Sequence, residues 1–161
     1  MKGIYDNNLN FSPSKAAYKK ELVQSWGDWI SDKYPWNIYG TFTFRGPSIK
    51  AQAMGISYVT DAYADAQWHG HIKEIEDIQG EEVFWVRVGE KTKNDVLHYH
   101  ALLGNVSISP DKLSKLWYPR GGISKVLEYD SELGAAWYIS KTTDNIDFSS
   151  NFSTSSGAKS G

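Results

Sequence analysis

The stretch from residue 97 to residue 103, Leu-His-Tyr-His-Ala-Leu-Leu, constrains the fold of this chain more than any other part of it. Its residues favour a β-strand, it contains no proline or glycine, and Gly104 and Asn105 follow it. Because side chains alternate across a strand, His98 and His100 share one face, about 6.6 Å apart along it. Two imidazoles so placed can bind one metal ion, or they can be a half-buried pair without a ligand.

Composition limits what kind of metal site and what kind of partner are possible. The chain has no cysteine, so a metal ion would have to be bound by His, Asp and Glu. It has no run of 18 apolar residues and no apolar leader near its N-terminus, so no membrane partner is expected. The net charge of −2 argues against strong non-specific binding of nucleic acid, but it permits a local basic surface.

The spacing of apolar residues predicts an α+β fold in one domain. Strands that are not regularly separated by helices favour a central antiparallel sheet of about five strands, with helices packed mainly on one face. Residues 1–148 are expected to form this domain, and the Ser- and Gly-rich residues 149–161 a flexible tail or linker. The expected helices are 13–32, 48–78, 109–117 and 132–142; the expected strands are 36–45, 82–90, 97–103 and 123–129, with a fifth at 2–5 or 145–148.

Glu90 is the third candidate ligand, because it lies at the end of the strand that precedes the two histidines. If it opposes His98 or His100 across a hairpin, all three side chains project from one face. That register requires an odd number of residues in the loop within 91–97, or a bulge, because a slip of one residue reverses the face. A carboxylate and two imidazoles would suit Mg²⁺ or Mn²⁺ that binds phosphate oxygens. The alternative is an ordinary hairpin glutamate in water.

A second His-x-His pair, His69 and His71, lies in the predicted helix 48–78. Residues two apart on a helix diverge and do not face each other. Both histidines are therefore expected at the surface, without a second metal site.

Tyr138 and Lys141 are three residues apart on the predicted last helix, so they share one side of it. A tyrosine can act as a covalent nucleophile when a nearby cation or base activates its hydroxyl. Lys141 can supply that charge or hold a phosphate. The same spacing also fits a core tyrosine beside a lysine that extends to solvent.

Taken together, the motifs resemble those of the HUH endonucleases that initiate rolling-circle replication, the Rep proteins. The segment His98-Tyr99-His100 is similar to the HUH motif, in which a hydrophobic residue separates two histidines. The segment 138–141, Tyr-Ile-Ser-Lys, is similar to the YxxK motif, and 41–44, Thr-Phe-Thr-Phe, is similar to the motif on the first strand. Their order along the chain is also that of the family.

The resemblance implies a five-stranded antiparallel sheet and Mn²⁺ or Mg²⁺ held by Glu90, His98 and His100. It implies that Tyr138, assisted by Lys141, attacks single-stranded DNA at a replication origin, including one presented in a hairpin. The products would be a 5′-phosphotyrosine link and a free 3′-hydroxyl. A host or fused helicase would be a partner, and the location would be the cytoplasm of a bacterial or archaeal host, or the nucleus if the source is a eukaryotic virus. The residues expected to contact DNA are Thr43, Arg45, Lys91, Lys93, Arg120 and Lys125.

Two alternatives remain open at the level of the sequence. A single-tyrosine transposase of the same superfamily also carries the two histidines before a helical tyrosine, although such enzymes usually have a glutamine where this chain has Lys141. A non-catalytic module could instead bind single strands by stacking bases on aromatic residues of the sheet. The aromatic residues expected to serve in that case are Phe42, Phe44 and Trp85.

Overall fold

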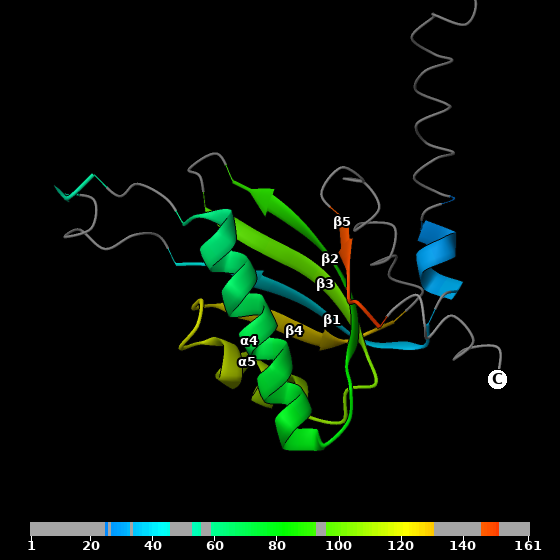
Figure 1. The fold of residues 1–161 in the computed structure, drawn as a ribbon. Coiled ribbons are helices and arrows are strands. Elements are labelled where there is room, and N and C mark those ends of the chain that lie inside the picture. Colours follow the sequence, from blue (N-terminus) through cyan, green and yellow to red (C-terminus); the bar gives the residue numbers. More distant parts are fainter. Residues whose placement is uncertain are drawn as a thin grey trace, which may run out of the picture.

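The computed structural model describes seven stretches of the chain, and it shows an α+β fold built on one sheet (Figure 1). The described residues are 25, 27–32, 34–45, 53–55, 59–92, 96–130 and 146–151. The labelled strands are β1 (Trp36–Thr43), β2 (Phe84–Lys91), β3 (Leu97–Gly104), β4 (Ser124–Glu128) and β5 (Ile146–Phe148); the labelled helices are α4 (Asp61–Gln79) and α5 (Pro110–Trp117).

The sheet has five strands in the order β4-β1-β3-β2-β5, and each pair of neighbours is antiparallel. The predicted fold class is therefore confirmed, and the fifth strand lies at 146–148, one of the two places expected for it. The strand with the two histidines, β3, occupies the centre of the sheet. Such a position holds its side chains firmly, because both edges of β3 are hydrogen-bonded to neighbours.

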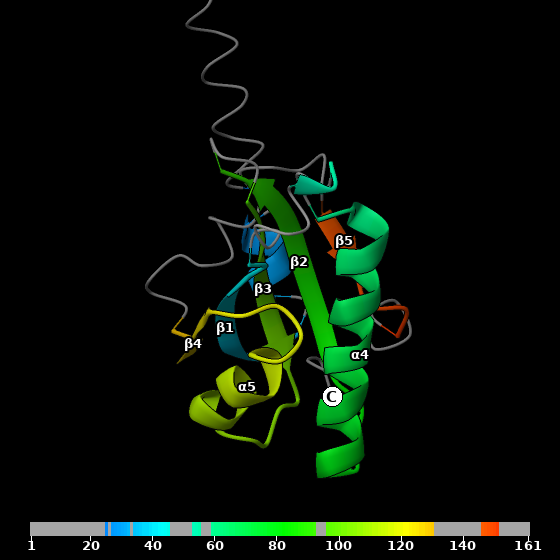
Figure 2. The ribbon, with the colours of Figure 1, turned by 90° about the vertical axis from the view of Figure 1, so that its left-hand side faces the viewer.

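Helices α4 and α5 cover one face of the sheet, which we call the helix-covered face (Figure 2). Ser109 caps α5 and Pro110 is its first residue, as the sequence predicts. Helix α4 begins later than predicted: Thr60 is extended, and its hydroxyl accepts a hydrogen bond from the Tyr63 amide at 3.1 Å. This N-cap starts α4 at Asp61, so the structure confirms the helix expected over 48–78 from Asp61 onward. The core below the helices contains Phe42, Phe44, Trp68, Trp85, Tyr99, Leu103, Leu113 and Trp117.

The opposite face of the sheet is divided into an apolar half and a polar half. In the apolar half, Ile30 of the helical segment 27–32 packs against Val86, Val88 and Leu102. The polar half lies further along the same strands. Its side chains alternate along each strand with those that point into the core below α4 and α5. The candidate ligands lie in this polar half, so we call this side the ligand face.

The expectation that both histidines of the second His-x-His pair lie at the surface is wrong for His71. His69 is exposed and forms an ion pair with Asp65, but His71 is fully buried among the rings of Phe42 and Trp117. The two histidines do point in different directions, as residues two apart on a helix should, but the side chain of His71 points into the core. Burial, with a smaller contribution from the charge of a nearby arginine, lowers the pKa of His71 to about 3.

His71 should make the free energy of unfolding depend on pH. Its pKa is about 3 when folded and 6.5 in the unfolded chain, so between these values only the unfolded state binds the proton. Stability should therefore fall as pH falls from 6.5 towards 3, by about 1.4 kcal/mol per pH unit from this residue. Urea unfolding of the native chain and of His71→Leu at several pH values measures the difference. If the free energy of unfolding changed equally with pH in the two proteins, this account of His71 would be contradicted.

Interactions with the sheet continue beyond the expected end of the domain at residue 148. The Ser149 amide donates to the Trp85 carbonyl at 3.0 Å, and the Asn151 amide group donates to the Val83 carbonyl at 3.4 Å. Residues 149–151 therefore follow the edge of β2. The predicted helix 132–142, with Tyr138 and Lys141, lies outside the described residues, as do Lys93 and most of the predicted helix 13–32.

Candidate metal centre

The hairpin of β2 and β3 has the register that a three-ligand site requires. Glu90 pairs directly with His98, and Lys91 pairs with Leu97. Five residues, 92–96, connect the strands, and the Thr92 amide donates to the Val96 carbonyl at 3.0 Å across the base of the loop. The prediction of an odd-numbered connection is therefore confirmed, and Glu90 shares its face with both histidines.

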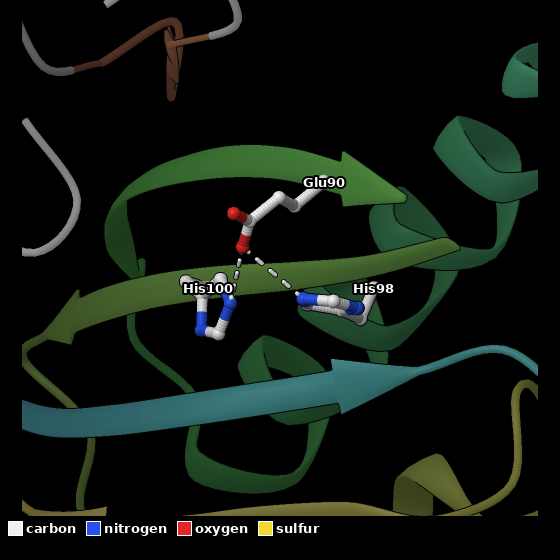
Figure 3. Close-up of side chains that lie close together, drawn as sticks. All are labelled: Glu90, His98 and His100. Carbon is white, nitrogen blue, oxygen red and sulfur yellow. Dashed lines mark hydrogen bonds and ion pairs between the residues drawn. The ribbon is translucent and has the colours of Figure 1, made fainter. Parts of the chain in front are cut away.

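The three side chains converge on one point of the ligand face (Figure 3). Oε2 of Glu90 lies 3.2 Å from Nε2 of His98 and 3.0 Å from Nε2 of His100. One ligand atom from each residue lies within 4.8 Å of the other two. In the close-up, the carboxylate of Glu90 points from β2 towards the rings of both histidines on β3. A carboxylate and two imidazoles at this spacing can hold a metal ion.

Burial within the group increases from the carboxylate to the second histidine. The side chains of Glu90, His98 and His100 are 41%, 16% and 8% exposed. Burial, and then the charge of His98, lower the pKa of His100, and Glu90 partly opposes this shift. His100 is therefore held in the neutral form, which is the form that binds metal ions. The carboxylate at the outer side leaves the group open towards solvent.

Thr41 is a member of the site that the sequence did not single out. It pairs with His100 across β1 and β3, and its hydroxyl Oγ1 lies 3.2 Å from Nδ1 of that histidine. The sequence does place Thr41 and Thr43 two residues apart on the first strand, and therefore on one face of it. Recognising it required the register of β1 against β3, which connects residues almost 60 positions apart.

Of the described residues that were expected to contact DNA, some share the face of this group and others do not. Thr43 pairs with His98, and Lys125 pairs with Thr41, so these two share the ligand face. Arg120 is on the helix-covered face instead, with Nε 3.5 Å from Oε1 of Glu74 on α4, so it does not belong to the cluster.

Of the other described cations of that set, Arg45 has its partner at Tyr118 and Lys91 lies on the opposite face of the sheet. Arg45 stacks on the ring of Tyr118 at 5.2 Å and donates to its carbonyl at 2.7 Å. Lys91 follows Glu90 directly in β2 and therefore projects to the opposite face. Among the described basic residues of that set, Lys125 is placed on the ligand face by its pairing in the sheet.

The aromatic residues expected to stack on bases are buried, which contradicts that part of the alternative. Phe42, Phe44 and Trp85 are 0%, 2% and 4% exposed and pack below α4 and α5. Tyr99, between the two histidines, also points to the helix-covered face, where burial raises its pKa to about 12. A neutral, enclosed phenol on the wrong face of the sheet is not a candidate nucleophile.

A buried arginine forms a second charged cluster that the sequence did not reveal. Arg87 is 5% exposed, stacks 4.3 Å from the centre of the Tyr99 ring, and forms ion pairs with Asp65 of α4 and Asp147 of β5. The two aspartates line an open groove of about 1240 Å³ between α4 and the β2–β5 edge. Arg87 therefore connects the short edge strand to the helix and stabilises the sheet that carries the ligands.

Comparisons with known proteins leave the site to be interpreted from its own geometry. No protein-family model matches the sequence, and neither the curated proteins nor the solved structures give a significant match. Within the stretches that the structure describes, no helix combines the length and the apolar composition needed to cross a bilayer.

Proposed function

We propose that this chain is the endonuclease domain of a rolling-circle replication initiator of the HUH type. In this proposal it nicks and rejoins single-stranded DNA at a specific site through a covalent link to Tyr138. One observation carries the proposal: Glu90, His98 and His100 meet on one face of a five-stranded antiparallel sheet, opposite the face that α4 and α5 cover. The motif order, with the Thr-Phe-Thr-Phe strand before the histidines and Tyr138 after them, gives the second line of support.

The position of the tyrosine motif between β4 and β5 supports the same proposal. These two strands are the opposite edges of the sheet, so the connection from Glu128 to Ile146 links one edge to the other. Four spacings between neighbouring strands make that width about 19 Å. In the sequence, Tyr138 lies near the middle of this connection.

The proposed reaction is a transfer of a phosphodiester from DNA to the protein. The phenol oxygen of Tyr138 forms a bond to the scissile phosphorus, and the bond from phosphorus to the 3′-oxygen breaks. The phenol loses its proton, and the leaving 3′-oxygen gains one and becomes a hydroxyl. No atom is oxidised or reduced, and attack by the 3′-hydroxyl in the reverse direction rejoins the strand.

The donor set fits a divalent ion of the first transition row. Imidazole nitrogens suit such ions, whereas Mg²⁺ strongly prefers oxygen ligands. We therefore propose Mn²⁺ ahead of Mg²⁺. A divalent ion held by the three residues would supply Lewis acidity to a phosphate oxygen and neutralise developing negative charge. The residues themselves supply Nε2 of each of the two imidazoles and a carboxylate that is partly exposed to solvent.

Lys141 is proposed to stabilise charge at the phosphate or at the tyrosine oxygen. Lys141→Ala should slow single-turnover cleavage by about 10²-fold or more, the usual effect of losing one such group. Lys73→Ala is the matched control, because Lys73 is an exposed lysine of α4 that pairs with Asp77 on the helix-covered side. Equal cleavage rates for Lys141→Ala and the native chain would remove Lys141 from the mechanism.

The proposal is tested by forming the covalent product. The protein is incubated with a pool of randomised single-stranded oligonucleotides labelled at the 3′ end, with Mn²⁺ or with a chelator, and separated under denaturing conditions. A labelled protein band that appears only with Mn²⁺ is expected, because the 3′ fragment retains the phosphate that joins the tyrosine. Binding of the pool without any denaturant-stable band would instead favour a non-catalytic single-strand-binding module.

A further inference from the structure

We propose that Thr41 is a positioning residue of the metal centre, whose hydroxyl accepts the Nδ1 proton of His100 when Nε2 of that histidine binds the ion. This inference rests on the proposed metal site and adds to it a residue outside the three ligands. Thr41 belongs to β1, a different strand from those that carry the ligands, so the site would extend over three adjacent strands.

The geometry assigns the two nitrogens of His100 to different partners. Nε2 faces the carboxylate of Glu90 at 3.0 Å, and Nδ1 faces the hydroxyl of Thr41 at 3.2 Å. His100 is 7% exposed, so water has little access to either nitrogen of its ring. A neutral imidazole carries one proton, and a nitrogen that binds a metal ion cannot keep it. The proton must then be on Nδ1, where the Thr41 oxygen accepts it.

A threonine hydroxyl also suits the state without metal. It can donate to Nδ1 when the proton of His100 moves to Nε2 and is shared with Glu90, because a hydroxyl is both donor and acceptor. A buried nitrogen therefore keeps a hydrogen bond in both states. Partners of this kind orient the ring and raise its basicity, and their loss typically weakens metal binding by about 10- to 100-fold.

The other histidine provides an internal comparison. Thr43 stands opposite His98 in the same pairing of β1 with β3 that places Thr41 opposite His100. Among the described residues, however, the Thr43 side chain forms no hydrogen bond to His98, whose side-chain hydrogen-bond partner there is Glu90. The two threonines share strand, face and partial burial, and they differ in this contact. Thr43 is therefore a matched control for a role of Thr41 through the histidine.

The test compares Thr41→Val, Thr41→Ser and Thr43→Val by titration calorimetry with Mn²⁺ alone, without DNA. Valine keeps the branched shape of threonine and removes the hydroxyl, whereas serine keeps the hydroxyl. We expect Thr41→Val to raise the Kd for Mn²⁺ by about 10- to 100-fold. Thr41→Ser should restore most of the affinity, and Thr43→Val should change it by less than about threefold.

The possible results separate this inference from the proposal on which it rests. If the native chain binds no Mn²⁺, the metal site itself is wrong, and the role of Thr41 is wrong with it. If the native chain and Thr41→Val bind Mn²⁺ equally, the metal site stands and the positioning role is refuted. Equal losses in Thr41→Val and Thr43→Val would also refute it, because they would show a general effect of changing β1. Melting temperatures of the metal-free variants identify any variant that fails to fold.

Discussion

Tyr138→Phe is expected to abolish formation of the covalent protein–DNA product and, with it, strand nicking. The substitution removes one oxygen, the proposed nucleophile, and keeps the ring, so the fold and the affinity for single-stranded DNA should not change. The rate should fall by at least about 10³-fold, because the hydroxyl that is proposed to form the bond to phosphorus is removed. Single-turnover cleavage of an oligonucleotide that the native chain cuts, analysed under denaturing conditions, measures this effect.

The matched control for the tyrosine is Tyr63→Phe. Tyr63 is a half-exposed residue of α4, so it lies on the side of the sheet away from the three ligands. This variant should cleave at the native rate. A normal amount of phosphotyrosine product from Tyr138→Phe would show that another residue attacks the DNA, and the YxxK-like motif would lose its assigned role.

Glu90→Ala should weaken the binding of Mn²⁺ by more than about 100-fold, beyond the range for residues that only support a ligand. The carboxylate is the one anionic ligand of the group, and its Oε2 lies within 3.2 Å of both imidazole nitrogens. Its side chain is 41% exposed, so its removal should disturb the packing little and leave both histidines in place. Calorimetry with Mn²⁺ measures the affinity, and the rise in melting temperature with added Mn²⁺ gives an independent measure.

Glu128→Ala is the control for this change, because Glu128 is an exposed strand glutamate that pairs with Ile38 across β4 and β1, away from the ligands. It should bind Mn²⁺ as the native chain does. Native affinity in Glu90→Ala would exclude Glu90 as a ligand, even if the two histidines still bound the ion.

The centre of the sheet could be predicted well from local patterns. The two histidines alternate with apolar residues in one strand, and the requirement that Glu90 share their face was enough to fix the odd-numbered loop between β2 and β3. The short strand β5 was harder to place, because three residues carry almost no periodic signal. It was one of two candidates, and its pairing with β2 involves Asp147 and Arg87, residues 60 positions apart.

The parts that sequence reasoning missed depend on which face of an element is covered. Phe42 and Phe44 have the pattern of exposed stacking residues, but α4 and α5 pack over them. His71 is polar, yet it points into the same core, where Gly70 beside it lets Arg120 approach the helix closely. Helical spacing predicts the angle between two side chains, but not which of them faces the sheet. Contacts between segments far apart in the sequence decide this. Thr41 was missed because its contact with His100 likewise depends on the pairing of distant strands.

Mass spectrometry of the covalent product tests the central claim most directly. The denaturant-stable product formed with Mn²⁺ is treated with nuclease and then with protease, and the peptides are searched for an added nucleotide. The account predicts a nucleotide joined through its 5′-phosphate to Tyr138, in a peptide that is unmodified when a chelator replaces Mn²⁺. A nucleotide on any other residue, or an unmodified Tyr138 in chain that has cut its DNA, would contradict it.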